Sequence, residues 1–542
     1  MNELSQIFKN AADNTVVVLE KNKVYDVRQD DSFEFEGYYC SNTAKLDENP
    51  NGLRRTAVYL KEKKNIVIDG NGATLVVHGK MTPILFDRCE NITVRNLTVD
   101  YACPTMAEFT VLSNVSGECV LNINEECLFR LDGNDLVWHG EKGADGELYW
   151  EHGCTANKRY VKLYNPETQL SRDFNRNNLV FESIEMLDKT TLKVILKNRE
   201  ADLPAGSVVQ SRSIVRDQTG SFFERCKNLV FENCRIMFMH GLGMVSQFCE
   251  NVTFRNCDFT PKAGRTAAST ADFFQFSGCR GNLIIDSCKA GGAHDDYINV
   301  HGTHLQIVET DGVNHLTVRF IHPESWGFQA FEAGDEINFI KWDTLKPYAT
   351  AKVTAFERLD DIDIKLTVEG EIPPVELCKD VVENKSWTPN LYVRNCDFGP
   401  TSGRGILCTT RGEVVIENNR FNKLWGPALL IEDDCNFWFE SGYTTNVVFR
   451  NNLVSCCEYA AMWEGSPVIR CTPKVMDENS TEYVHGKLVV TGNEFRNPPT
   501  GEHLILLEYM RETIIEENIF DAPYSVKTKC ADTVVDRNNI VR

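Results

Sequence analysis

Three aspartates close together in the chain could carry acid–base chemistry. Asp272 lies in the stretch STADFFQF (269–276), and Asp295 and Asp296 lie in GGAHDDYINVHG (291–302). Carboxylates held near one another repel, so one of them should keep its proton near neutral pH. A protonated acid beside an ionised base is what the hydrolysis of a glycosidic bond requires. The residue types therefore predict a glycosidase site, provided that the fold brings the three side chains together.

The spacing of these aspartates suggests how they would meet. The step from Asp272 to Asp295 equals one plain step of a repeat that runs through the chain, such as that from Cys234 to Cys257. We therefore expect the two aspartates at equivalent positions on neighbouring turns, about 5 Å apart. Consecutive residues of a strand face opposite sides, so Asp296 shares the cleft only if the chain bends. The glycine pair before His294 makes such a bend available.

The repeat consists of a few β-forming residues, a charged residue, Asn or Cys, and a closing position. After Cys234 the copies follow one another at short steps, with a single long interruption before Cys396. Short strands at a recurring period stack into a parallel β-helix, in which Asn side chains form ladders and Cys fills the interior. The copies are Val94–Leu97, Phe231–Cys234, Phe254–Cys257, Ile285–Cys288, Val393–Cys396, Ile416–Asn419, Phe449–Asn452, Val490–Asn493, Ile515–Asn518 and Val535–Asn538.

Two interruptions of the repeat are each long enough for a small domain. One lies between Leu97 and Cys234 and the other between Cys288 and Cys396, and both show the alternation of antiparallel strands. We expect an all-β, right-handed parallel β-helix with two inserted β-barrel-like subdomains. The expected parts are an N-terminal β-helix segment (1–104), a first insert (105–215), the central β-helix with the aspartates (216–304), a second insert (305–386) and a C-terminal β-helix (387–542).

Composition excludes other classes of protein. The 57 Lys and Arg against 78 Asp and Glu give a net charge of −21, which argues against a nucleic-acid partner. The longest apolar runs, such as Leu504–Leu507, are far shorter than a membrane span, so no membrane partner is expected. The 20 Cys residues mostly stand alone in apolar runs and are expected to be buried thiols. With no signal peptide at Met1, we expect a cytoplasmic protein, although a removed leader would give the same start.

The aspartate stretch resembles the bacterial α-1,3-galactosidases of glycoside hydrolase family 110, some of which act on the blood-group B antigen. The matching residues run from Thr270 to Gly302, with further matches in GRGIL (403–407), LIEDD (430–434) and WFESG (438–442). That family is similar in build, a right-handed β-helix carrying two small β-barrels. The same spacing of aspartates is more distantly similar to that of polygalacturonases.

The resemblance implies hydrolysis with inversion and without a covalent intermediate. It assigns the general acid to Asp295, and the holding and deprotonation of water to Asp272 and Asp296. It also implies an exo-acting enzyme that removes terminal α-1,3-linked galactose from a glycan. Turn spacing alone would suit the roughly 5 Å separation of retaining enzymes, whereas inversion needs about 6.5 to 9.5 Å.

Two departures bear on the substrate. The family pattern has His where this chain has Gln275, a neutral amide that binds hydroxyls but cannot titrate. The polygalacturonase motif continues to Arg-x-Lys, which grips a uronate, whereas residues 303–307 here read THLQI. A neutral sugar is therefore favoured over galacturonate.

Several further side chains are candidates for binding the sugar. Each has a plain alternative, because a lone His, Trp or charged residue is often only part of a turn, the core or a solvated surface. The candidates are Gln275, His294, His301, Arg404, Asp434, Trp438, Glu440, Trp463 and Glu464, with Trp425 as another apolar face.

Other interpretations of the same residues stay open. His294, Asp295, Asp296 and His301 could ligate a metal, but the family uses none and Asp272 has a better role as a base, so we expect no cofactor. The expected partner is a glycan with terminal α-galactose, and self-association is left open. The alternatives are a non-catalytic glycan-binding β-helix, a polygalacturonase-like hydrolase and a Ca²⁺-dependent lyase.

Overall fold

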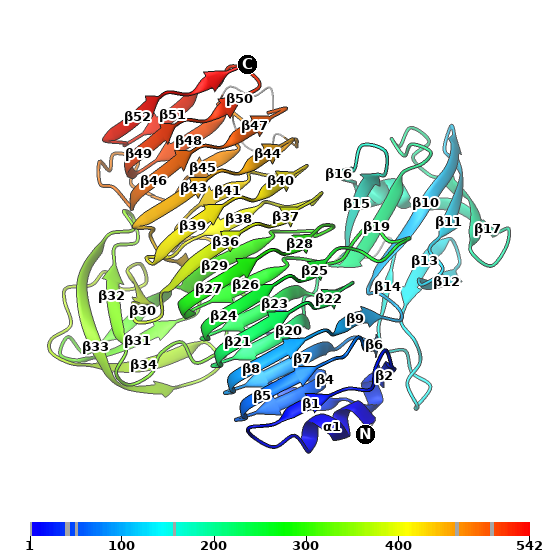
Figure 1. The fold of residues 1–542 in the computed structure, drawn as a ribbon, viewed down its shortest axis with the longest axis horizontal. Coiled ribbons are helices and arrows are strands. Elements are labelled where there is room, and N and C mark those ends of the chain that lie inside the picture. The colour runs from blue at the N-terminus through cyan, green and yellow to red at the C-terminus, as the bar shows by residue number, and fades with distance from the viewer. Residues whose placement is uncertain (1–2, 38–43, 49–51, 155–158, 461–464, 499–502) are drawn as a thin grey trace.

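The computed structural model describes residues 3–37, 44–48, 52–154, 159–460, 465–498 and 503–542, and forms a parallel β-helix with two inserts (Figure 1). A short helix α1 (Glu3–Lys9) lies at its N-terminal end, and 3-10 turns span Gln29–Asp31 and Arg176–Leu179. Three sheets run the length of the solenoid, and strands stacked within each are parallel except at β3 and β42. The predicted fold class is confirmed. In the described ranges no helix has the length and apolarity needed to cross a lipid bilayer.

Each turn of the solenoid, here called a rung, contributes one strand to each sheet. Sheet 1 contains β1 (Val16–Val18), β5 (Lys64–Asp69), β8 (Glu90–Arg95), β21 (Lys227–Glu232), β24 (Glu250–Arg255), β27 (Arg280–Asp286), β36 (Pro389–Arg394), β39 (Glu413–Glu417), β43 (Asn446–Arg450), β46 (His485–Thr491), β49 (Met510–Glu516) and β52 (Thr533–Arg537). Sheet 2 contains β2 (Val24–Arg28), β6 (Thr74–His78), β9 (Thr98–Tyr101), β22 (Arg235–Ile236), β25 (Asp258–Phe259), β28 (Lys289–Ala290), β37 (Asp397–Phe398), β40 (Arg420–Asn422), β44 (Leu453–Ser455), β47 (Glu494–Arg496), β50 (Ile519–Phe520) and β53 (Ile540–Val541).

Sheet 3 carries the segments that the sequence marked for chemistry. It contains β3 (Phe33–Glu36), β4 (Leu53–Lys61), β7 (Thr82–Asp87), β20 (Thr219–Glu224), β23 (Leu242–Gln247), β26 (Phe274–Ser277), β29 (Ile298–Thr303), β38 (Ile406–Cys408), β41 (Leu429–Ile431), β45 (Ile469–Cys471), β48 (Ile505–Glu508) and β51 (Val526–Lys529), with β42 (Glu440–Ser441) paired to β29.

The repeat motif forms the corner between sheets 1 and 2. Its third position adopts a left-handed backbone, with φ of 52° at Asn233 and 53° at Asn256, a conformation that Asn tolerates better than most residues. Its fourth position points inward. There, Asn419 donates its amide to Asn452 at 3.1 Å and Asn452 donates to Asn493 at 3.0 Å, so the expected ladder is present.

Cysteine fills the same inward column on earlier rungs. The fourth-position residues Cys234, Cys257, Cys288 and Cys396 are all buried. Every cysteine within the described residues is a free thiol, and most are buried, as expected of a small apolar filler. Apolar residues at alternate positions of sheet 1 complete the core, with the rings of Phe231 and Phe254 stacked 5.2 Å apart.

The first insert is an open sheet with a core of its own. A seven-stranded sheet contains β10 (Met106–Val115), β11 (Glu118–Ile123), β15 (Arg159–Asn165), β16 (Leu170–Asp173), β17 (Phe181–Met186), β18 (Thr191–Leu196) and β19 (Val208–Ser213), and a three-stranded sheet contains β12 (Leu128–Asp132), β13 (Asp135–His139) and β14 (Glu151–Gly153).

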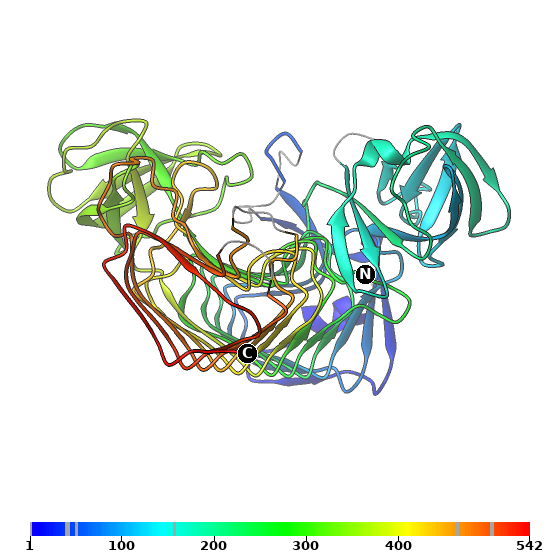
Figure 2. The same cartoon turned by 90° about the horizontal axis from the view of Figure 1, so that it is seen from above.

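The second insert is a closed barrel with a separate core. Its strands are β30 (Leu305–Thr310), β31 (His315–Arg319), β32 (Glu336–Ile340), β33 (Pro347–Arg358), β34 (Asp363–Val368) and β35 (Val381–Asn384). Viewed along the solenoid, the two inserts rise on the same side of it and stand apart from each other (Figure 2).

Candidate active site

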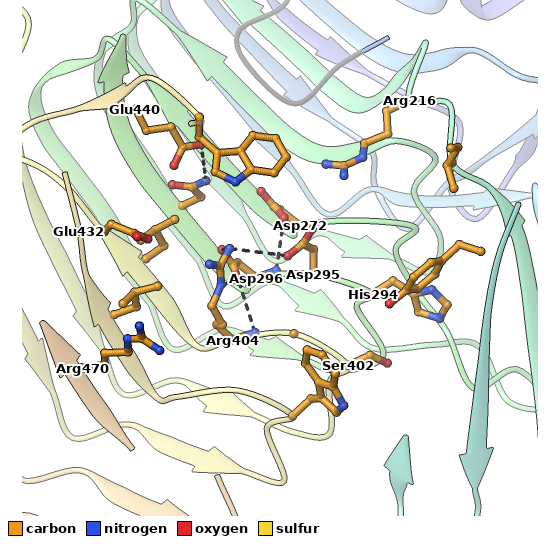
Figure 3. Close-up of a pocket in the computed structure, with 18 of the residues that line it drawn as sticks. Arg216, Asp272, His294, Asp295, Asp296, Ser402, Arg404, Glu432, Glu440 and Arg470 are labelled. Carbon is orange, nitrogen blue, oxygen red and sulfur yellow. Dashed lines mark hydrogen bonds and ion pairs between the residues drawn. The ribbon is translucent and has the colours of Figure 1, made fainter. Parts of the chain in front are cut away.

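A cavity of about 460 Å³ opens over sheet 3, beside the first insert. Its lining includes all three aspartates, and side chains from β15 and β19 of the first insert close one side. Figure 3 shows the carboxyl groups of Asp272, Asp295 and Asp296 gathered at its centre, next to Arg404. The fold thus places in one cavity the residues on which the glycosidase prediction depends.

The register of sheet 3 corrects one sequence-based expectation. Phe274 pairs with Ile298, so the rung equivalent of Asp272 is Asp296 and not Asp295. Ile298 in turn pairs with Ile406, which makes Arg404 the equivalent on the next rung. The expectation that Asp272 and Asp295 are equivalent was wrong by one residue, because the rung between β26 and β29 is one residue longer than the plain step of the repeat.

A bend before β29 turns two neighbouring aspartates toward the same space. Gly292 has φ of +80°, and a Cβ on it would lie 2.7 Å from the backbone oxygen of Thr266, so only glycine fits there. Asp295 and Asp296 follow in a non-strand segment, which frees them from the strict alternation of a strand. One carboxylate oxygen from each of the three aspartates can be chosen so that all lie within 4.8 Å of one another.

The three carboxyl groups differ in exposure and in partners. Asp272 and Asp296 are buried, whereas the side chain of Asp295 is 34% exposed and faces the cavity. Arg404 bonds both oxygens of Asp296, at 2.6 and 2.7 Å, and lies 3.8 Å from Asp295. The backbone N–H of Asp296 donates to Asp272 at 3.3 Å.

Burial and mutual repulsion raise the pKa of two members of the trio. Burial, together with the charges of Asp295 and Asp296, raises the pKa of Asp272 well above its usual value. Burial raises the pKa of Asp296 to about 6, with Asp295 adding to the rise and Arg404 opposing it. The sequence-based expectation of a carboxyl that keeps its proton near neutral pH therefore has a concrete location in Asp272.

Glu440 of β42 lines the cavity, and polar side chains behind it contact its carboxylate. Its carboxylate accepts a hydrogen bond from the Asn299 amide at 3.3 Å, and Nε2 of His301 lies 3.6 Å away. His301 also contacts the backbone oxygen of Gly302 through Nδ1 and the amide of Gln275 through Nε2. Glu440 and Asn299 line the cavity, while His301 and Gln275 lie behind them as buried support.

His294 lines the cavity as a fixed, neutral imidazole. Its Nδ1 accepts from Nε of Arg212 at 3.3 Å, so its Nε2 carries the hydrogen that points to Oε1 of Gln210 at 2.8 Å. Burial, reinforced by the charges of Arg212 and Lys162, lowers the pKa of His294 well below its usual value. The imidazole thus orders the wall beside Asp295 and does not titrate in the working range.

The tryptophan candidates and the acidic candidates Asp434 and Glu464 lie in different places. Trp438, 43% exposed, and Trp425 line the cavity. Asp434 lies outside the lining and instead accepts backbone N–H bonds from residues 436–438, which shapes the loop that presents Trp438. The remaining candidates, Trp463 and Glu464, lie outside the described residues.

The first insert supplies cavity residues that sequence reasoning missed. Tyr160 and Lys162 come from β15 and Arg212 from β19. Lys162 Nζ bonds the backbone oxygen of Ser402 at 2.9 Å and lies 4.2 Å from the ring of Trp425. These contacts join distant parts of the chain, and no local pattern marks them. Glu432 and Asn299 were also missed, although both lie inside motifs that the resemblance had singled out.

The aspartate trio also has the residue types of a cation site. Among the described residues it is the cluster of carboxylate, His or Cys ligands close enough to hold a metal ion. Arg404 already bonds both oxygens of Asp296, so a guanidinium supplies positive charge where a metal would need ligands. The three carboxylates could therefore accept a cation, but the Arg404 guanidinium already provides positive charge at Asp296.

Comparisons with known proteins identify relatives of this chain. The family model described as GLAA-B beta-barrel domain II matches residues 315–382, within the closed barrel. Alpha-1,3-galactosidase A of Akkermansia muciniphila is 36% identical over 84% of this chain and 73% of its own length. Alpha-1,3-galactosidase A of Bacteroides fragilis is 34% identical over 87% and 76%, and alpha-1,3-galactosidase B of Bacteroides thetaiotaomicron is 29% identical over 93% and 82%.

Similarity to solved structures is weaker. An exopolygalacturonase of Thermotoga maritima aligns with 100% of this chain and 96% of its own at 12% identity, with a TM-score of 0.36, too low to establish a shared fold. The sequence relatives, by contrast, are 29 to 36% identical over most of both chains. On that similarity the chain belongs to glycoside hydrolase family 110, the family of the α-1,3-galactosidases.

Proposed function

We propose that this protein is an exo-acting, inverting α-1,3-galactosidase that removes terminal α-1,3-linked galactose from glycans. The observation that carries the proposal is the meeting of Asp272, Asp295 and Asp296 within 4.8 Å in one cavity. The names of the sequence relatives supply the substrate class. Gathering three acids around a single close cation costs solvation and repulsion, and such an arrangement is characteristic of catalytic sites.

The cavity suits the end of a glycan better than the middle of a polymer. It is bounded by the first insert on one side and by the Trp438 loop on another, and its volume is about 460 Å³. Uncharged hydrogen-bonding groups such as Asn299 and Thr472 line it together with acidic and basic side chains. This supports cleavage of one terminal residue at a time.

We assign the proton donor to Asp295. It is the trio member with the most exposed side chain, and it faces the open part of the cavity where the leaving sugar would lie. As the acid, Asp295 is placed to deliver a proton to the glycosidic oxygen as that bond breaks.

We assign the base to Asp296, with Asp272 as the partner that holds the water. With a pKa of about 6, Asp296 is mostly ionised at neutral pH and can accept a proton from an attacking water. Asp272, whose pKa is raised further, lies beside it and can donate a hydrogen bond to the same water. The water attacks the anomeric carbon while the proton from Asp295 goes to the departing alcohol, so charge is conserved.

The stereochemical outcome is a separate part of the proposal. Oxygens within 4.8 Å are closer than the roughly 6.5 to 9.5 Å typical of inverting pairs. Inversion is therefore proposed on the family resemblance and not on this distance. Proton NMR of the first product tests this point: β-galactose supports inversion, and α-galactose contradicts it.

The activity itself is tested with purified protein and a panel of glycans. Release of galactose from α-1,3-galactobiose or a B-type oligosaccharide is expected, and no release from any α-galactoside would defeat the proposal. Activity on polyuronate, with or without sensitivity to a chelator, would favour a polygalacturonase or a lyase. Binding without turnover would favour a glycan-binding β-helix. A cytoplasmic location and self-association stay predictions.

A further inference from the structure

A second cavity of about 260 Å³ lies next to the catalytic one, between the first insert and sheet 2. The hairpin of β15 and β16 forms one wall with Tyr164, Gln169 and Ser171. The opposite side comes from the solenoid and includes Gly291 and Gly399. The proposed mechanism does not use this space, although Gly291 and Gly292 on its solenoid side belong to the motif that carries Asp295 and Asp296.

The glycines on the solenoid side have no explanation in the packing of the chain. Lys289 pairs with Asp397 and Ala290 with Phe398, so Gly291 and Gly399 lie side by side on adjacent rungs. A Cβ on Gly291 would meet only the Pro400 oxygen at 3.8 Å, and one on Gly399 only the Ala290 oxygen at 3.4 Å. Neither glycine has a left-handed backbone, so a side chain would fit at both positions.

Glycines on the catalytic side behave differently. A Cβ on Gly403 would lie 2.1 Å from the backbone oxygen of Asp295, and one on Gly405 would lie 2.2 Å from that of Ala428. Those two glycines are needed because neighbouring rungs approach closely. Gly291 and Gly399, just beyond the ends of β28 and β37, instead leave a bare floor in an open cavity, and backbone without side chains lets a ligand approach closely.

The groups around the floor suit an uncharged, hydroxyl-rich ligand. Tyr164 offers a half-buried ring, and its hydroxyl has no hydrogen-bond partner among the described residues. Lys289 and Asp397 lie next to each other on paired strands at the rim, and Asp397 also lies 3.8 Å from Arg420, so the rim carries charges of both signs. An aromatic face, a flat floor and amide groups such as Gln169 are the elements that bind a pyranose ring.

Two residues, Gln210 and Ser402, lie between this cavity and the catalytic one. Gln210 lines the second cavity and bonds His294 of the first at 2.8 Å. Ser402 lines both, and its backbone oxygen accepts the Lys162 bond. A ligand on the glycine floor would therefore touch the residues that fix the wall beside Asp295.

We propose that the cavity over Gly291 and Gly399 is a second, non-catalytic binding site for a neutral pyranose of the same class of glycan that the enzyme hydrolyses. The proposal rests on the proposed function for the identity of the sugar. It adds a place where glycan is retained near the catalytic cavity without being cleaved.

The test uses the full chain carrying Asp295→Asn, which slows cleavage, with α-1,3-galactobiose as the probe. Crystals soaked with the disaccharide should show a sugar ring on the glycine floor as well as one in the catalytic cavity. Calorimetric titration should require two sites. An empty glycine floor in crystals whose catalytic cavity is filled, or a titration with one site, overturns the proposal.

A pair of substitutions ties the second site to the floor. Gly291→Val fills the cavity where a side chain meets no close neighbour, and should weaken the second site about tenfold or more while changing the first less than about twofold. Ser455→Val is the control, because Ser455 lies two rungs beyond Gly399 in the same column and outside both cavities. Two unchanged sites in Gly291→Val overturn the proposal, whereas a wild-type enzyme that releases no galactose would instead defeat the proposed function.

Discussion

Two buried acidic sites in this protein are built in opposite ways. Where the closed barrel meets the solenoid, Glu383 of β35 forms an ion pair with Arg411 at 2.7 Å and accepts from the Asn338 amide at 2.9 Å. In the catalytic cavity, three carboxyl groups share Arg404, which bonds one of them closely, and Asp272 has no cation within ion-pair distance among the described residues.

The pKa values of Glu383 and Asp272 shift in opposite directions. Burial alone would raise the pKa of Glu383, but Arg411, His304 and the Asn338 bond outweigh it and leave the pKa lowered. The same burial raises the pKa of Asp272, because the neighbouring charges there are also negative. A buried acid that serves the fold is neutralised by a partner, whereas one that serves chemistry is left with its repulsion.

Removing the shared cation should have the largest effect. Arg404→Met leaves Asp295 and Asp296 without a counter-charge, so the pKa of Asp296 should rise further and the base should be protonated at neutral pH. We expect kcat/KM at pH 7 to fall by about a hundredfold or more, with the remaining activity shifted to higher pH. Arg404→Lys is the matched control and should retain more activity, and a pH profile unmoved by Arg404→Met would contradict this role.

The pH profile of the unaltered enzyme comes next. Because the pKa of Asp296 is about 6, kcat/KM should fall about tenfold per pH unit below that value as the base takes up a proton. Initial rates on α-1,3-galactobiose from pH 4 to 8 measure this. Full activity at pH 4 would show that Asp296 is not the base.

Neutralising one acid at each site should change stability with opposite signs. At pH 7, Glu383→Gln should lower the melting temperature, since it leaves the largely buried Arg411 with only its neutral partners Asn384 and Thr388, at a cost of about 3 kcal/mol. Asp272→Asn should raise it, corresponding to about 1 kcal/mol, since it removes a buried acid that keeps in the fold a proton lost by the unfolded chain at this pH.

The two stability effects should also depend on pH in opposite ways. A lowered pKa at Glu383 stabilises the fold above the pKa of the unfolded chain, and that contribution is lost as pH falls. A raised pKa at Asp272 costs stability as pH rises, so the advantage of Asp272→Asn should grow from pH 4 to pH 8. Calorimetric melting at several pH values measures both, and a shift of the same sign for both variants would remove the contrast.

The smallest effect should come from the contact through which the barrel region reaches the cavity. The rings of His322 and Trp438 lie 4.5 Å apart. Because such a contact stabilises by about 1 kcal/mol, His322→Ala should raise KM a few-fold through a less ordered Trp438 and leave kcat nearly unchanged. Steady-state kinetics on the disaccharide separate the two, and a large loss of kcat would show that the barrel takes part in the chemistry.

The sequence predicted the solenoid because its corner chemistry is local. Asn233 and Asn256 take a left-handed backbone, and Asn419 and Asn452 form a ladder, so each copy of the repeat carries its own conformational signal. The cavity was only partly predictable. The aspartates share one short motif region, but Lys162 and Arg212 reach the cavity across the tertiary packing of the first insert, which no local pattern encodes.

The exact pairing of residues between neighbouring strands was also not predictable from the sequence. The plain step of the repeat pointed to Asp295 as the neighbour of Asp272, but the rung is one residue longer and Asp296 takes that position. Likewise, alternation along the LIEDD motif would place Glu432 and Asp434 on one side, yet only Glu432 lines the cavity because Asp434 turns back to bond residues 436–438. Loop length and turn bonding decide these positions, and neither follows from residue spacing.

In the proposed mechanism, Asp295 is the proton donor and Asp296 is the base. Asp295→Asn and Asp296→Asn should be compared on aryl α-galactosides whose leaving groups range from weakly to strongly acidic. An enzyme without its proton donor should recover as the leaving group needs less protonation, so Asp295→Asn should approach wild-type rates on the most activated substrate while Asp296→Asn stays slow on all. Recovery of Asp296→Asn, or equal losses by both variants across the series, would contradict the assignment.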